Sequence, residues 1–304
     1  MGRYSTPLGV EQAIKSAAIR QKELGLTNSI SDAIHREYRN RFLSRVFSVE
    51  AGSRWILKGG TGMLARIHDA RMTVDVDLIS EIGNLDDALD ELRQLSKIDL
   101  GDFFRFDYLK HSQIGAGENQ PNIDGYRVSF AVYIGNAHKG RIQIDVMRGS
   151  LITGEVELIE PKDRLEIPKL MSFPYRLYPL VDQTADKISA VAEKYDSQSS
   201  SRVKDLVDLV EIALHFDLGG SDLRCALYAE LSHRRREVPP ELLIPAQWIA
   251  GYRKLAQDTL AVKGYEDFEL ACELVKRFVD PVLADDVDGK TWSCDLRKWE
   301  KAKF

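Results

Sequence analysis

The sequence has few cysteines, no long apolar run and no excess of basic residues. Its three cysteines, Cys225, Cys272 and Cys294, are far apart and odd in number. This excludes a disulfide framework and a paired-cysteine zinc site, and it favours a cytoplasmic location. No segment approaches the roughly 18 apolar residues of a membrane span. Polar residues occur throughout the first 25 positions, which lack an apolar signal-peptide segment, so no signal peptide is expected. The net charge of −5 excludes a general nucleic-acid coat, so a nucleic acid would have to meet a local basic patch.

What is present suffices for a sizeable core, because 44% of the 304 residues are hydrophobic. The composition changes after Pro179. Residues 1–180 mix helical and strand patterns, whereas residues 181–304 show helical patterns only. We therefore predict an α+β fold, in which a mixed sheet with flanking helices over 1–180 is followed by an all-helical lobe over 181–304. The proline-rich junction 160–180 is expected to be an irregular crossover.

Apolar periodicity predicts helices over 9–24, 31–48, 61–69 and 85–97, the last of them capped by Asn84. Alternating patterns predict strands in SRWILK and MTVDVDLIS, and a hairpin of YRVSFAVYIG and GRIQIDVMRG around Gly135–Gly140. Further helices are expected over 181–195, 201–216, 221–232, 246–260 and 266–280. The polar stretch YDSQSSSR interrupts the first two of these.

Basic residues gather in two places. The segment 31–48 has an apolar face formed by Ile34, Tyr38, Phe42 and Val46. Its other side carries arginines that are expected to be solvated: Arg36, Arg39, Arg41 and Arg45. The run His233–Arg236 fits either a helix C-terminus, which favours cations, or a contact with an RNA backbone. The six histidines show no metal-ligand spacing.

Two aspartates lie two residues apart in the strand MTVDVDLIS. Side chains alternate across a strand, so Asp75 and Asp77 share one face, while Val74, Val76 and Leu78 face a core. By the same alternation, Asp145 in RIQIDVM points away from its apolar neighbours. If the two strands are neighbours, three carboxylates converge on one surface and require a compensating cation. Mg²⁺ suits a few carboxylates plus substrate phosphates, and Mn²⁺ is an alternative.

The sequence KGGTG precedes this strand. Gly59 and Gly60 allow a tight turn and a close approach to a ligand. Thr61 is expected to cap the helix that follows, whose first N–H groups attract anions. The stretch is not a phosphate-binding Gly-Lys-Ser/Thr loop, because Lys58 precedes the glycines. The alternative interpretation of KGGTG and the strand after it is purely structural: a tight turn followed by a surface strand.

The residues Lys58-Gly59-Gly60-Thr61, Arg71-Met72-Thr73-Val74-Asp75-Val76-Asp77 and Asp145 resemble the signature of the AbiEii/AbiGii-type nucleotidyltransferase toxins. That family belongs to the DNA-polymerase-β-like nucleotidyltransferase superfamily and includes tRNA-modifying toxins of mycobacteria. Ala185–Ala190 resembles its helical lysine motif, and Arg202–Leu209 resembles its Arg-x-x-Asp-x-x-Asp motif. Together these matches cover roughly residues 55–215, in order. Val74 stands where relatives often have a polar or basic residue.

The resemblance implies a role for each matched residue. Asp75, Asp77 and Asp145 would bind the metal ions, and Asp145 would also help to deprotonate the attacking hydroxyl. Lys187 and Asp208 would complete the catalytic set. The residues implied in nucleotide binding are Lys58, Gly59, Gly60, Thr61, Arg71, Arg202 and Asp205. Without the resemblance, Lys187 can be a surface lysine with a buried stem, and Arg202, Asp205 and Asp208 can form an ion-pair ladder.

The resemblance implies transfer of a nucleoside monophosphate from an NTP to RNA, with the 3′ acceptor end of tRNA as the expected acceptor. This transfer would block translation. It also implies a toxin–antitoxin system with a cognate antitoxin as partner. Three alternatives stay open: transfer to a small molecule or protein, a non-catalytic RNA- or partner-binding module, and a Mg²⁺-dependent nuclease. An intact carboxylate triad disfavours the non-catalytic binding module, because buried charges without a function are costly. A nuclease would leave the glycine turn and Lys187 without a role.

Overall fold

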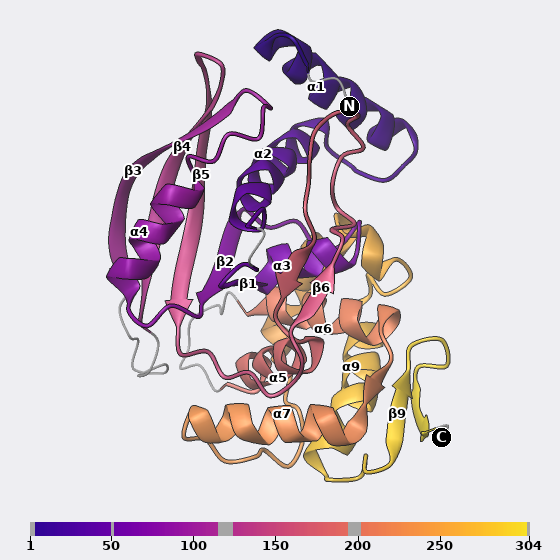
Figure 1. Cartoon of the computed structure of the whole chain (residues 1–304). Coiled ribbons are helices and arrows are strands. Elements are labelled where there is room, and N and C mark those ends of the chain that lie inside the picture. Colours follow the sequence, from indigo (N-terminus) through magenta and orange to yellow (C-terminus); the bar gives the residue numbers. More distant parts are fainter. Residues whose placement is uncertain (1–3, 50–51, 115–123, 194–201, 303–304) are drawn as a thin grey trace. The chain divides into compact units, whose positions relative to one another are not determined.

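The computed structural model describes residues 4–49, 52–114, 124–193 and 202–302, which are drawn in colour in Figure 1. They divide into two compact units. The first comprises Met1–Ser150 with Val156–Leu177, and the second comprises Leu151–Glu155 with Tyr178–Phe304. The first unit contains the large sheet, and the second is mainly helical.

A seven-stranded mixed sheet forms the first unit, in the order β3-β4-β5-β2-β1-β7-β6. Strands β2 and β5 are parallel neighbours, as are β1 and β7, and the remaining pairs are antiparallel. This confirms the predicted α+β class. The strands are β1 (Trp55–Lys58), β2 (Asp75–Ser80), β3 (Phe104–Ile114), β4 (Asp124–Ile134), β5 (Ala137–Arg148), β6 (Glu157–Ile159) and β7 (Tyr175–Leu177).

Four helices accompany this sheet: α1 (Pro7–Glu23), α2 (Ile30–Val46), α3 (Gly59–Arg66) and α4 (Leu85–Leu95). Asn84 caps α4 as predicted, because its side chain accepts a hydrogen bond from the N–H of Asp87. The predicted apolar face of α2 is also confirmed. Phe42 lies in the core, with its ring centroid 5.2 Å from that of Phe106 and 5.0 Å from that of Phe130. In Figure 1, α4 lies against the strands β3–β5.

The prediction that the arginines of α2 form a solvated face is wrong. Arg36, Arg39, Arg41 and Arg45 are all buried. Arg41 and Arg45 both contact the buried carboxylate of Asp102, at 2.8 and 2.7 Å. Asp102 lies just before β3, 61 and 57 residues away in sequence. Asp102 compensates the charges of the two buried arginines. The spacing of the arginines along α2 could not reveal this partner.

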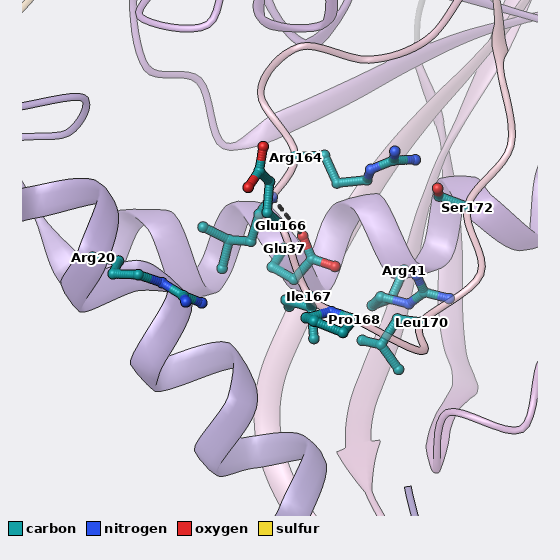
Figure 2. A pocket seen from close by; sticks show the side chains of 10 residues that line it. Arg20, Glu37, Arg41, Arg164, Glu166, Ile167, Pro168, Leu170 and Ser172 are labelled. Carbon is teal, nitrogen blue, oxygen red and sulfur yellow. Dashed lines mark hydrogen bonds between the residues drawn. The ribbon is translucent and has the colours of Figure 1, made fainter. Parts of the chain in front are cut away.

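Beside these arginines, the first unit contains a cavity of about 340 Å³. Figure 2 shows its polar lining, in which Arg20, Arg41 and Arg164 surround Glu37 and Glu166. Glu37 accepts a hydrogen bond from the N–H of Leu165 at 3.3 Å. Burial raises the pKa of Glu37 to about 7, although the charge of Arg41 opposes the shift.

The second unit is not all-helical, contrary to prediction. Besides its helices it contains a three-stranded sheet in the order β10-β9-β8, built by β8 (Leu218–Gly219), β9 (Lys290–Ser293) and β10 (Lys298–Lys301). Trp292, on β9, is buried and donates a hydrogen bond to the carbonyl of Ala213. The helices are α5 (Leu180–Val191), α6 (Val203–His215), α7 (Gly220–His233), α8 (Ile249–Gln257) and α9 (Phe268–Leu283), with short 3₁₀ turns at Ala246–Trp248 and Leu260–Val262.

Candidate functional site

The three predicted carboxylates lie on one face of the sheet. In the parallel pairing of β2 with β5, Asp77 is level with Asp145 and Asp75 is level with Gln143. Val76, between the two aspartates, is fully buried on the opposite face. The convergence expected from strand alternation is therefore confirmed. We call the surface that bears Asp75, Asp77 and Asp145 the carboxylate face.

Val74 departs from the predicted pattern. It is 71% exposed rather than buried in the core. The pairing of β2 with β5 begins at Asp75, and that with β1 reaches only Asp77. Val74 thus precedes the part of the strand that other strands flank. Alternation by itself could not show where the flanking strands end.

The two glycines bring the α3 N-terminus against the carboxylate face. A side chain at Gly59 would place its Cβ 2.0 Å from Oδ2 of Asp77, and Gly59 has a φ of +68°. A Cβ at Gly60 would lie 3.0 Å from that of Thr73. The close approach and the positive φ both require glycine at position 59. The run KGGTG therefore places the first turn of α3 beside Asp77.

Thr61 does not cap α3, contrary to prediction. The helix begins at Gly59 with Lys58 as its N-cap residue, and no side chain caps it. Thr61 is buried, and its hydroxyl donates a hydrogen bond to the carbonyl of Asp75 at 2.7 Å. It thus ties the helix to the start of β2. Arg71 is also buried, and it donates to the carbonyl of Met72 at 3.1 Å.

Arg127 is a residue of this site that the sequence did not suggest. It lies on β4 level with Asp145, so a polar row crosses four strands from Lys58 through Asp77 and Asp145 to Arg127. Its guanidinium donates to both oxygens of Asp145, at 2.8 and 2.7 Å. The hydrogen bonds and charge of Asp145 raise the pKa of Arg127, and Asp75 and Asp77 add to the shift.

The carboxylate face suits a divalent cation in its chemistry. Hard cations prefer oxygen ligands, and the guanidinium of Arg127 already occupies the position of a cation beside Asp145. As the side chains stand, the described part of the chain contains no group of three His, Cys, Asp or Glu residues that could enclose an ion. On the carboxylate face, Arg127 engages both oxygens of Asp145. An ion bound by Asp145 would therefore compete with Arg127 for the carboxylate oxygens.

We expect Arg127→Gln to bind Mn²⁺ more tightly than the unaltered protein, by up to about tenfold, because the competing charge is gone. Electron paramagnetic resonance titration of free Mn²⁺ measures this directly and requires no turnover. The matched control is Arg105→Gln on β3, which removes an arginine that is 52% exposed and paired with Asp107. Weaker or equal binding by Arg127→Gln would show that Arg127 does not compete with the ion.

The remaining predicted residues form a second cluster, within the second unit. Lys187 on α5 contacts Asp205 at 2.6 Å and Asp208 at 2.8 Å, and both aspartates lie on α6. Arg202 contacts Asp205 at 3.5 Å. Burial alone would lower the pKa of Lys187, but the charges of Asp208, Asp205 and Asp186 outweigh it and raise this pKa. That Lys187 and Asp208 reach the carboxylate face stays a prediction.

The run His233–Arg236 lies at and after the end of α7. Arg234 pairs with Glu230 and Asp186, and Arg236 pairs with Glu193. Arg234 is only 7% exposed. These two guanidinium groups are therefore neutralised within the unit, which weakens the interpretation as an RNA contact.

Comparison with known proteins identifies the family of this chain. The family described as "Nucleotidyl transferase AbiEii toxin, Type IV TA system" matches residues 41–273, which is more than half of the chain. The chain belongs to the AbiEii family. It is thus a nucleotidyltransferase toxin of a type IV toxin–antitoxin system, with an NTP substrate and an antitoxin partner implied by the family. Members of the family generally use a divalent metal.

One solved structure, that of MenT4, shares the fold. MenT4, a nucleotidyltransferase toxin from Mycobacterium tuberculosis, is 17% identical with a TM-score of 0.54, and the match covers 89% of each chain. JHP933 from Helicobacter pylori is 13% identical with a TM-score of 0.46, covering 84% of this chain and 95% of that one. No curated protein matches the sequence. No helix among the described residues of this AbiEii protein is long and apolar enough to cross a membrane.

Proposed function

We propose that this AbiEii protein transfers a nucleoside monophosphate from an NTP to the 3′ end of an RNA, with tRNA as the acceptor, in the presence of Mg²⁺ or Mn²⁺. The observation that carries the proposal is the arrangement of the first unit. Asp75, Asp77 and Asp145 share one face, and Gly59 brings the α3 N-terminus against Asp77. Carboxylates for a cation and helix N–H groups for phosphates meet at one point.

In the proposed reaction, a ribose hydroxyl of the RNA attacks the α-phosphorus of the NTP. The new P–O bond forms as the bond to the β-phosphate oxygen breaks, and pyrophosphate leaves. A bound divalent cation would stabilise the charge of the attacking and leaving oxygens. Asp75, Asp77 and Asp145 would hold that cation, and Asp145 would accept the proton of the hydroxyl. The first N–H groups of α3 would hold the triphosphate.

A tRNA whose 3′ end carries an added nucleotide cannot accept an amino acid, so the proposed reaction would block translation in the cytoplasm. The antitoxin would restore growth by preventing or reversing that block. Support for tRNA as the acceptor comes from the motifs shared with tRNA-modifying relatives. The residues themselves support metal-assisted transfer of a phosphate group.

The test is to incubate the protein with Mg²⁺, total tRNA and each α-³²P-labelled NTP in turn. We expect label on RNA with at least one NTP, and loss of labelling when EDTA removes the metal. A γ-³²P label should not be transferred, because pyrophosphate leaves. If the α-label reaches only a protein or a small molecule, or reaches no acceptor at all, the proposed function is wrong.

A further inference from the structure

A hollow of about 190 Å³ opens where β2 begins. It is lined by residues of α2, the segment before β2, the end of β4 and the start of β5. Val74 lines it and directly precedes Asp75. Arg141 also lines it and lies two residues before Gln143, which is level with Asp75. The hollow, which we call the β2-entry groove, is therefore lined by the residue that directly precedes the first carboxylate.

The groove is basic in an otherwise acidic protein. Its lining has three cationic side chains, Arg39, Lys139 and Arg141, against one carboxylate, Asp32. Lys139 pairs with Glu11 at 2.7 Å. Arg141 is exposed and makes no ion pair within the described ranges. An anion that entered the groove would meet a cation that no described carboxylate neutralises.

Arg39 provides the second observation. It is 5% exposed, and its Nη2 has no hydrogen-bond partner among the described residues. Burial lowers the pKa of Arg39, whereas the charges of Asp163, Asp32 and Asp75 partly offset the shift. A buried guanidinium with an unused donor is costly unless an acceptor arrives. A phosphate oxygen is the acceptor that a guanidinium binds best.

Apolar side chains complete the lining. Met72 and Val74 are 36% and 71% exposed, respectively, which is high for apolar residues beside a catalytic strand. Tyr38 lines the groove as well. Cations next to exposed apolar and aromatic surface match a nucleotide unit, whose phosphate is anionic and whose base is flat and weakly hydrated.

Two other basic sites are less suited to a polyanion. The arginines of His233–Arg236 that pair with carboxylates are neutralised within the second unit. The cavity in Figure 2 opposes three arginines with Glu37 and Glu166. The β2-entry groove has a larger excess of positive charge, and Asp75 is close enough to influence Arg39 electrostatically.

We propose that the β2-entry groove binds the acceptor RNA strand near its 3′ end, with Arg39 and Arg141 on a backbone phosphate and a nucleoside against Met72 and Val74. The inference rests on the proposed function. An in-line displacement needs the acceptor and the leaving pyrophosphate on opposite sides of the α-phosphorus. The N-terminus of α3 lies beside Asp77, and the groove opens beyond Asp75, so the two ligands would approach from different ends of the aspartate pair.

The test measures binding of a 5′-fluorescein tRNA acceptor stem to the full chain by anisotropy, without NTP and with EDTA. Arg141→Gln is chosen because Arg141 is exposed, so the variant should fold normally. We expect its Kd to rise about tenfold at low salt, with the slope of log Kd against log salt reduced by about one. NTP affinity should stay the same. Arg105→Gln, which removes an exposed arginine of β3 outside the groove, should bind RNA like the unaltered protein.

Equal RNA affinity of Arg141→Gln and Arg105→Gln would overturn the inference. The transfer assay separates this result from failure of the proposed function. If the unaltered protein labels RNA while Arg141→Gln keeps the same KM for RNA, only the groove assignment is wrong. If the unaltered protein labels no RNA, the proposed function is wrong and the groove assignment with it. We expect Arg141→Gln to raise the KM for RNA about tenfold and to affect kcat much less.

Discussion

Replacing Asp75 or Asp77 with alanine is expected to remove nucleotidyl transfer, by several orders of magnitude, without unfolding the protein. Metal positioning and charge neutralisation carry most of the catalysis of phosphoryl transfer. Both side chains are only partly buried, on the face opposite the core residue Val76. Loss of one charge from a repelling carboxylate set costs little stability and can raise it.

Val76→Ala is the matched control, because it shortens a side chain on the same strand but on the core face. Val76 is fully buried, so this change should lower the free energy of unfolding by roughly 1–3 kcal/mol through lost burial and a cavity. Thermal melts without metal and transfer rates with Mg²⁺ measure the two properties separately. Aspartate variants that melt well below the unaltered protein, or that keep near-normal transfer, would show that the strand is structural.

The parts of the first unit's site that depend on strand alternation could be predicted from the sequence, because alternation decides on which face of a strand a side chain lies. Alternation in TVDVDLI put Asp75 and Asp77 on one face, and alternation in RIQIDV put Asp145 away from its apolar neighbours. The structure confirms both expectations, because β2 and β5 are neighbours in parallel register. Gly59 was predictable as a turn residue, but its contact with Asp77 depends on the pairing of β1 with β2.

Arg127 could not be predicted, because its position depends on the register of a hairpin. The pairing of β4 with β5 shifts between Val132 and Tyr133, and this irregularity decides that Arg127 is level with Asp145. Counting back from the turn without the shift pairs different residues. The prediction of solvated arginines on α2 was wrong for a related reason, since Asp102, the partner of Arg41 and Arg45, is remote in sequence. Strand β3 was not predicted, and its second half is largely exposed.

Lys187 is the candidate site residue whose replacement is expected to destabilise the protein most. Its ammonium group contacts Asp205 and Asp208, whose side chains are 9% and 1% exposed. Removing one partner of a buried ion pair leaves an uncompensated charge away from water. Lys187→Met should therefore lower the free energy of unfolding by about 3–5 kcal/mol. Urea unfolding followed by circular dichroism measures the loss, and Lys204→Met, on the exposed side of α6, is the control with little expected effect.

A second variant separates the structural contribution of Lys187 from a catalytic one. Neutralising both carboxylates in Lys187→Met/Asp205→Asn/Asp208→Asn removes the stranded charges, so most of the lost stability should return. The comparison for activity is Asp205→Asn/Asp208→Asn, which lacks the same carboxylates but keeps the lysine. If Lys187 contacts the triphosphate as its motif implies, the triple variant should transfer at least tenfold more slowly than this double variant at equal folded fraction. Equal transfer rates would make Lys187 a structural residue, because its ion pairs with α6 would then account for its whole effect.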